Sequence, residues 1–180
     1  MVDPTQQNEL NSWAIQVIPR AVVYARKLLR NPSDAEDIVQ DSLVRLFRKA
    51  GDYDILNDGV RILFRTITNL CINATTRQRE IASLTMGDDF AELPLVDRLQ
   101  FLPEEIAVGS ELSERIEEIL ATLPPLQRAA VELRALGNTK QEIAQILQIS
   151  ETNAGVLVYR ARTTLAKELE PYLQPHMSEK

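Results

Sequence analysis

Residues 139–165 read TKQEIAQILQISETNAGVLVYRARTTL, and this stretch decides the fold of the chain. Thr139 is suited to begin a helix, and Glu142 follows three positions later, which is the spacing of a capping box. After a short break at residues 148–149, Ser150 is suited to begin a second helix. Apolar residues recur in that second helix at three- and four-residue intervals: Ala154, Leu157, Val158, Ala161 and Leu165. Two helices joined in this way predict a helix-turn-helix, whose second helix enters a DNA major groove.

The same pattern also occurs in an ordinary αα-hairpin inside a helical bundle, so the pattern alone leaves that alternative open. Upstream of it, residues 111–123 have helical spacing and end at Pro124. A further helix is expected from Pro125 to Leu136, because proline suits a first helical turn and Gly137 suits the position after a helix end. The C-terminal part of the chain is therefore predicted to be entirely helical.

The N-terminal part has three more helical patterns. The first covers residues 9–29, with a kink or a break expected at Pro19. The second is expected to begin at Ser33, with Glu36 completing a capping box and acidic residues in the first turn. The third runs from about residue 59 to residue 79 and becomes rich in Asn, Thr and Arg towards its end, residue types that hydrogen-bond to bases and phosphates.

The distribution of charge divides the chain. The 180 residues have a net charge of −6, yet residues 81–110 alone hold 1 basic and 6 acidic residues, a net of −5. We expect this segment to be an acidic linker between domains at 9–80 and 111–170, followed by a loose tail at 171–180. With one cysteine and one histidine, the chain lacks the ligands of a usual zinc site, and we expect no metal, no cofactor and no enzyme activity. No apolar run approaches the length of a membrane span, so we expect no membrane insertion.

Two segments carry a family resemblance. Residues 34–47, DAEDIVQDSLVRLF, resemble the core-polymerase-binding helix of extracytoplasmic-function sigma factors, and residues 123–162 resemble the promoter-binding domain of the same family. The resemblance implies an all-α fold with two small helical domains, sigma domains two and four, joined by the acidic linker. It also implies a cytoplasmic promoter-specificity subunit whose partners are core RNA polymerase, through its clamp helices and flap, promoter DNA and an anti-sigma factor.

The resemblance implies three sets of binding residues. The core-polymerase set is Asp34, Glu36, Asp37, Gln40 and Asp41. The set for melting and binding the −10 element, on the segment ILFRTITNLCIN and beyond, is Arg65, Asn69, Asn73, Arg77 and Arg79. Asn69 is expected to capture a flipped base. The −35 set is Thr139, Lys140, Ser150, Glu151, Thr152, Asn153, Val156, Arg160 and Arg162.

The chain departs from the family pattern at several positions. Ile62, Thr68, Gly155 and Val156 stand where the family often has Trp, Arg, Lys and Ser, and Gln148 replaces the usual turn glycine. If residue 148 has positive φ, a non-glycine residue there costs about 1 kcal/mol. Two alternatives to a sigma factor stay open: a sigma-like protein that binds a partner without directing transcription, and a helix-turn-helix regulator that binds operator DNA alone.

Overall fold

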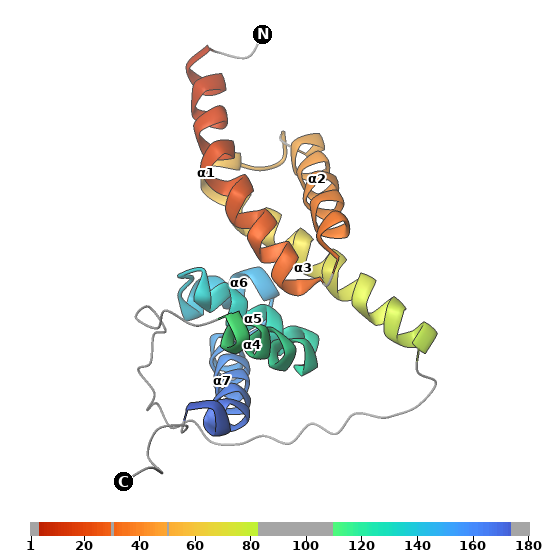
Figure 1. The fold of residues 1–180 in the computed structure, drawn as a ribbon. Helices are drawn as coiled ribbons and strands as arrows, with labels where there is room; N and C mark the ends of the chain where they lie inside the picture. Colours follow the sequence, from red (N-terminus) through yellow and green to blue (C-terminus); the bar gives the residue numbers. More distant parts are fainter. Residues whose placement is uncertain (1–3, 30, 50, 83–109, 174–180) are drawn as a thin grey trace.

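The computed structural model of the chain describes residues 4–29, 31–49, 51–82 and 110–173. These residues form seven α-helices and no strands (Figure 1), so the all-α expectation is confirmed over the described ranges. The helices are α1 Pro4–Leu28, α2 Pro32–Arg48, α3 Ile55–Ala82, α4 Ser110–Thr122, α5 Pro125–Ala135, α6 Lys140–Leu147 and α7 Glu151–Leu173. We call α1–α3 the N-terminal unit and α4–α7 the C-terminal unit. The acidic linker lies largely outside the described residues, and so does the end of the tail.

The N-terminal unit is built on α1 and α3, with α2 packed against both. Tyr24 of α1 is fully buried, and its hydroxyl lies 2.8 Å from the hydroxyl of Thr68 on α3. Thr68 in turn donates to the carbonyl of Phe64 at 2.7 Å. Near the other end, the two helices approach closely at Gly59, where an added Cβ would lie 2.9 Å from the Trp13 ring. A glycine is therefore required at this crossing.

Two of the expected helix boundaries in this unit are wrong. α1 is one helix with Pro19 inside it, so of the two alternatives offered at Pro19 the break is wrong, and the kink stays a prediction. Buried residues on both sides, such as Val17 and Ala21, pack into the core and outweigh one lost backbone hydrogen bond. α2 is capped by Asn31 and not by Ser33: the Asn31 side chain accepts from the Ser33 N–H at 3.0 Å, and proline occupies the first turn. Asparagine before proline is a better helix start than the serine further along.

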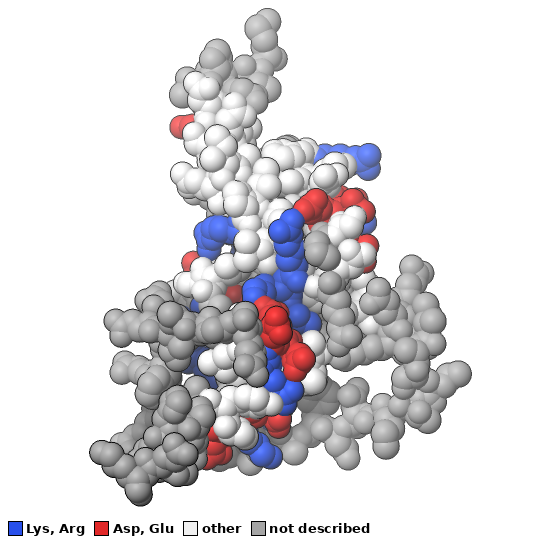
Figure 2. Space-filling view, viewed as in Figure 1, with Lys and Arg blue, Asp and Glu red and all other residues white. Residues whose placement is uncertain are grey.

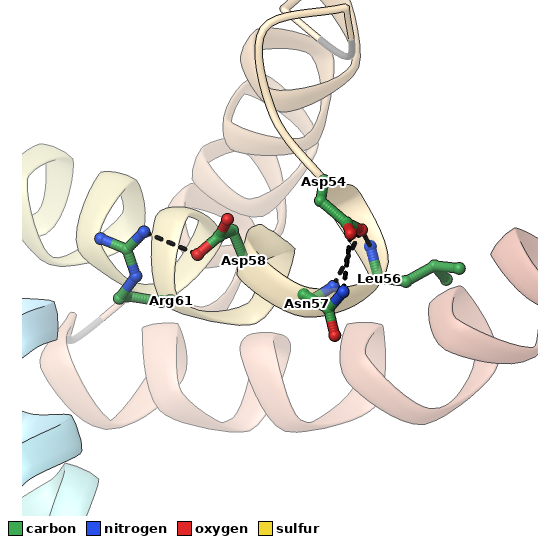
Figure 3. A network of polar contacts seen from close by, with 5 residues as sticks. All are labelled: Asp54, Leu56, Asn57, Asp58 and Arg61. Atoms are coloured by element: carbon green, nitrogen blue, oxygen red, sulfur yellow. Dashed lines mark hydrogen bonds and ion pairs between the residues drawn. The ribbon is translucent and has the colours of Figure 1, made fainter.

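The third helix also begins earlier than expected, at Ile55 instead of residue 59. Figure 3 shows why: the Asp54 carboxylate turns back over the first turn and accepts from the backbone N–H groups of Leu56 and Asn57 at 3.1 and 3.2 Å. The Asn57 side chain donates to the same carboxylate at 2.6 Å, and these bonds lower the pKa of Asp54. One turn further, Arg61 pairs with Asp58 at 2.8 Å.

The C-terminal unit has the predicted helix-turn-helix. Thr139 and Glu142 form the expected capping box at the start of α6, and Ser150 caps α7 by accepting from the Asn153 N–H at 3.1 Å. α7 packs against α4, α5 and α6 through buried Ala154, Leu157 and Ala161. It continues to Leu173, so Pro171, which was expected to begin the loose tail, lies inside the last helix. Gly137 follows α5 with φ of +89°, as its position predicted.

The two units pack against one another. α5 lies on α1 and α3, and α6 lies on α3 (Figure 1). Buried residues of both units belong to one continuous apolar cluster, which includes Tyr24 and Ile67 on one side and Leu133 and Ile143 on the other.

The turn of the helix-turn-helix yields a first prediction. Gln148 has φ of 57°, and it is the non-glycine residue with positive φ in the described part of the chain. Gln148→Gly should therefore stabilise the fold by up to about 1 kcal/mol, because the left-handed strain is relieved. Gln145→Gly, at an exposed position inside α6, is the control and should destabilise by about 1 kcal/mol. Urea unfolding of both variants measures the change in the free energy of unfolding. Equal destabilisation by both substitutions would show that Gln148 is not strained.

The capping box yields a second prediction. The Glu142 carboxylate accepts from the Thr139 N–H at 2.7 Å and from its hydroxyl at 2.8 Å, and these bonds, the backbone one first, lower its pKa. Because the folded state favours the ionised form, the stabilisation is present above the ordinary carboxyl pKa and is lost as pH falls through the lowered value. Glu142→Gln should cost about 0.5 kcal/mol at pH 7, a modest value because the site is exposed, and less at pH 3, where more of the wild-type carboxyl group is protonated. Urea midpoints at both pH values test this; a pH-independent difference would refute it.

Candidate nucleic-acid interfaces

The outer side of α2 is an acidic face made of the residues Asp34, Glu36, Asp37, Gln40 and Asp41, all of which are exposed. Its opposite side, with Ala35, Val39, Ser42 and Leu46, is buried against the rest of the N-terminal unit. This arrangement follows from helical periodicity, which separates the two sets. In Figure 2, acidic atoms cover part of α2 and basic atoms lie at its C-terminal end. The acidic face is thus presented to solvent and does not serve the chain's own core.

Two apolar side chains extend this face towards the end of α2. Val44 and Phe47 are 46% and 44% exposed, and the Phe47 ring meets Trp13 edge-on with centroids 6.4 Å apart. Within the face, Asp41 pairs with Arg45 at 2.8 Å, and Glu36 pairs with Arg26 of α1. An apolar centre beside charged groups is the usual composition of a protein-binding surface.

A groove of about 740 Å³ lies beside the acidic face, between the end of α2, the turn that follows it and α3. Five basic side chains line the groove: Arg45, Arg48, Lys49, Arg61 and Arg65. Asp41 is the acidic side chain in the lining. We call it the basic groove. Its local charge is opposite to the net charge of the chain, and such a surface attracts a phosphate backbone.

Of the five residues predicted to bind the −10 element, three line the basic groove, and the side chains of the other two are not described. Arg65, Asn69 and Asn73 all line the basic groove, and the two asparagines are exposed. Arg77 and Arg79 follow on α3, but their side chains lie outside the described set. Thr68, which stands where an arginine is common in the family, is buried and bonded to Tyr24, so it belongs to the core.

Part of the basic groove consists of residues that the sequence did not predict as binding residues. Tyr53, in the turn before α3, is 40% exposed and lines the groove together with Ile62. The signal was present, because an aromatic residue in a polar turn has no core to enter and offers a face on which a base can stack. Arg45, Arg48 and Lys49, at the end of α2, were likewise not among the predicted binding residues.

The helix-turn-helix presents its expected binding residues at a second surface. Ser150, Glu151, Thr152 and Asn153, at the start of α7, are exposed, and so are Thr139 and Lys140 at the start of α6. Val156, Arg160 and Arg162 are half-buried. The first turns of α7 can therefore reach base edges, as a recognition helix does.

Lys140 and Gly155 explain one departure from the family pattern. The aliphatic part of Lys140 crosses α7 at Gly155, where an added Cβ would lie 3.2 Å from Lys140 Cδ. The small residue on α7 thus makes room for a basic side chain that comes from α6. A lysine is common at position 155 in the family, and here the positive charge near this point is supplied by the neighbouring helix.

The three residue sets do not form one site. The acidic face and the basic groove adjoin on the N-terminal unit, where Asp41 belongs to both, whereas the recognition helix lies on the C-terminal unit. Within the described ranges, no three His, Cys, Asp or Glu side chains gather to hold a metal. None of the described helices is long and apolar enough to cross a lipid bilayer.

Two protein families match the chain in order. The family described as sigma-70 region 2 matches residues 14–81, and the family described as sigma-70 region 4 matches residues 113–165. These ranges contain the acidic face and basic groove in one case and the helix-turn-helix in the other.

Two relatives of the chain are also sigma factors. ECF RNA polymerase sigma factor SigE of Mycolicibacterium smegmatis is 31% identical over 177 residues, which cover 96% of this chain and 66% of that protein. This chain thus spans just under two thirds of the length of that relative. ECF RNA polymerase sigma factor SigW of Bacillus subtilis is 28% identical over 151 residues, 79% of each protein.

A solved structure supports the fold. The sigma factor RpoE, crystallised in complex with the anti-sigma factor NepR from Bartonella quintana, matches with a TM-score of 0.66 at 22% identity, over 89% of this chain and 96% of that one. The two matched regions, the curated relatives and the shared fold agree, and we conclude that the chain belongs to the sigma-70 family, among the extracytoplasmic-function sigma factors of bacterial RNA polymerase.

Proposed function

We propose that this chain is a promoter-specificity subunit that binds core RNA polymerase and directs initiation at −10 and −35 elements. The observation that carries the proposal is the order of the two matched regions, each of which contains an exposed surface suited to its task. The chain itself performs no bond chemistry in this proposal, because the polymerase does. It acts where the polymerase acts, in the cytoplasm.

The acidic face of α2 binds the clamp helices of the largest polymerase subunit. Asp37 and Asp41, one turn apart and exposed, meet basic side chains of the partner, while Val44 and Phe47 supply apolar contact area. Rim charges of this kind set orientation and association rate more than affinity. The apolar pair is therefore expected to carry much of the binding free energy.

The basic groove binds the melted −10 strand. Arg65 and its basic neighbours contact phosphates, Tyr53 stacks on a base and Asn69 hydrogen-bonds to a base edge. Extruding a base costs a few kcal/mol, and stacking together with edge hydrogen bonds offsets this cost. Asn73 extends the same side of α3, and Arg77 and Arg79, which follow later in the chain, are proposed to hold phosphates.

The start of α7 reads the −35 element. Glu151, Thr152 and Asn153 face base edges, and Val156 offers a methyl group to a thymine methyl. Thr139, Lys140, Ser150, Arg160 and Arg162 hold phosphates on either side. The C-terminal unit also contacts the polymerase flap.

An anti-sigma factor is the proposed inhibitor. RpoE of Bartonella quintana, which shares the fold, was crystallised with the anti-sigma factor NepR. Such a partner would occupy the surfaces that polymerase and promoter use. Transcription in its presence, at saturating concentration, should fall to the level of core enzyme alone.

Charge reversal on the acidic face tests core binding. Asp37→Lys with Asp41→Lys should weaken co-purification with core polymerase about tenfold or more, because like charges then meet across the interface. The matched control is Glu168→Lys with Glu170→Lys, an equal change of charge at exposed positions near the end of α7. Equal core binding by both double variants would show that α2 is not the docking helix.

Run-off transcription tests promoter recognition. Core enzyme with this chain should yield discrete transcripts from a genomic library that core enzyme alone does not. Asn69→Ala should lower promoter opening by about tenfold, as expected for losing a base contact of 1–3 kcal/mol, while core binding stays unchanged. Core binding without any promoter-dependent transcript would favour the sigma-like partner-binding protein instead. A footprint on DNA without polymerase would favour the stand-alone regulator.

A further inference from the structure

The seam where the two units meet contains polar contacts as well as apolar packing. Lys27 of α1 pairs with Glu117 of α4, and Arg20 of α1 donates to the Leu136 carbonyl at 3.3 Å. Figure 2 shows basic and acidic atoms side by side where the end of α1 meets α4 and α5. These contacts fix one particular arrangement of the two units.

A buried carboxyl group, Glu132 of α5, lies in this seam. It is 7% exposed, and its Oε1 atom has no hydrogen-bond partner among the described residues. Lys27 and Tyr24 of α1 and Arg128 of its own helix surround it, and Cys71 of α3 lies next to Tyr24 and Arg128. Burial raises the pKa of Glu132 more than Lys27 and Arg128 lower it. Closing the seam is therefore more costly with an ionised Glu132 than with a neutral one.

The seam is also incompletely packed. A pocket of about 330 Å³ that is open to solvent lies between the end of α1, α3 and the α4–α5 corner, with Leu28, Ile72, Leu123 and Arg128 in its lining. Water therefore reaches part of the boundary between the units. Together with the unsatisfied carboxyl oxygen, the pocket leaves the seam less completely packed than the core of the N-terminal unit, where Tyr24 has its partner.

The closed arrangement is too compact for both promoter elements. The −35 and −10 elements lie about 25 base pairs apart, which is about 85 Å along B-form DNA. Asn69 lies at the middle of α3, whose half-length is about 21 Å, and α6, which is about 12 Å long, packs on α3 at about 10 Å. The turn at 148–150 adds at most about 13 Å, so the start of α7 lies within about 60 Å of Asn69. One closed molecule cannot reach both elements at once.

We infer that the seam is a latch which keeps the free chain closed, and that the buried carboxyl group of Glu132 holds this latch near the point of opening. This inference rests on the proposed function, since the closed form matters only if the two units read separate elements. Residues 83–109 connect the units and can span at most about 90 Å, enough for the open form. Opening moves α5 away from α1 and exposes Glu132 to water.

The sign of the pH dependence follows from Glu132. Its pKa is raised in the closed form, so the closed form is most stable below the ordinary carboxyl pKa and loses stability as pH rises through the raised value. Closing takes up a proton and opening releases one. A neutral side chain of the same shape should keep the latch closed at every pH.

A pair of labels across the seam tests the latch. Cysteines at Gln16 and Glu168, exposed on α1 and α7, accept fluorophores in a Cys71→Ala background, because opening of the seam would also expose the native Cys71 thiol. Single-molecule energy transfer between pH 5 and 8 should show a compact and an open population, with the open one growing as pH rises. Glu132→Gln should raise the compact-to-open ratio at pH 7.5 about tenfold and remove its pH dependence.

Two substitutions on α4 provide the matched comparison. Glu117→Lys repels Lys27 across the seam and should lower the compact-to-open ratio about threefold. Glu118→Lys makes the same change of charge one residue further, where the partner is Arg115 of α4 itself, and should leave the ratio unchanged. A single open population in the wild-type chain, or Glu132→Gln with wild-type ratios and pH dependence, would overturn the latch.

Core enzyme and promoter DNA separate this inference from the proposed function. If both hold, adding them drives the labels to the open distance, and Glu132→Gln needs about tenfold more protein to saturate transcription, because only the open fraction is competent. If the ratios follow the predictions but no promoter-dependent transcript forms, the proposed function fails and the latch stands. If transcripts form and Glu132→Gln saturates like the wild type, the latch fails and the function stands.

Discussion

The packing of α1 against α3 is the contact on which the rest of this structure depends. α2 docks on this pair from one side and α5 from the other, so the acidic face, the basic groove and the seam all take their positions from it. At its centre, the Tyr24 and Thr68 hydroxyl groups satisfy one another away from water. An unpaired hydroxyl there would cost about 1–3 kcal/mol, which is a large share of the stability of a small domain. The close approach at Gly59 sets the other end of the pair.

Much of the fold could be predicted because helix starts are decided locally. The capping box at Thr139, the cap at Ser150 and the end of α5 at Gly137 each depend on residues within four positions of one another, and each prediction was confirmed. Asn31 and Ser33 are both suitable N-cap residues for α2, so the sequence leaves two possible helix starts. The proline that follows Asn31 favours the start at Asn31. At Pro19 the local rule left a kink and a break open, and tertiary packing around the proline excludes the break.

The surfaces were harder to predict than the helices. The acidic face follows from one helix and could be read from its periodicity, whereas the basic groove joins the end of α2, a turn and one side of α3. No spacing in the sequence shows that Arg48 and Arg65 line the same groove. The net charge of −6 points away from nucleic acid, and only the folded arrangement brings five basic side chains into one place. Likewise, nothing in the sequence places Glu132 opposite Tyr24, since that contact exists only between units.

The crossing of Lys140 over Gly155 has a consequence for how this recognition helix can change over evolutionary time. Any side chain added at position 155 would meet the lysine that crosses there, and the lysine would have to move. A new side chain at this position is therefore coupled to a shift of the lysine side chain from the other helix by a few tenths of an ångström. If α7 reads the −35 element as proposed, its base preference should change more easily through the exposed residues 151–153 than through the glycine one turn further along.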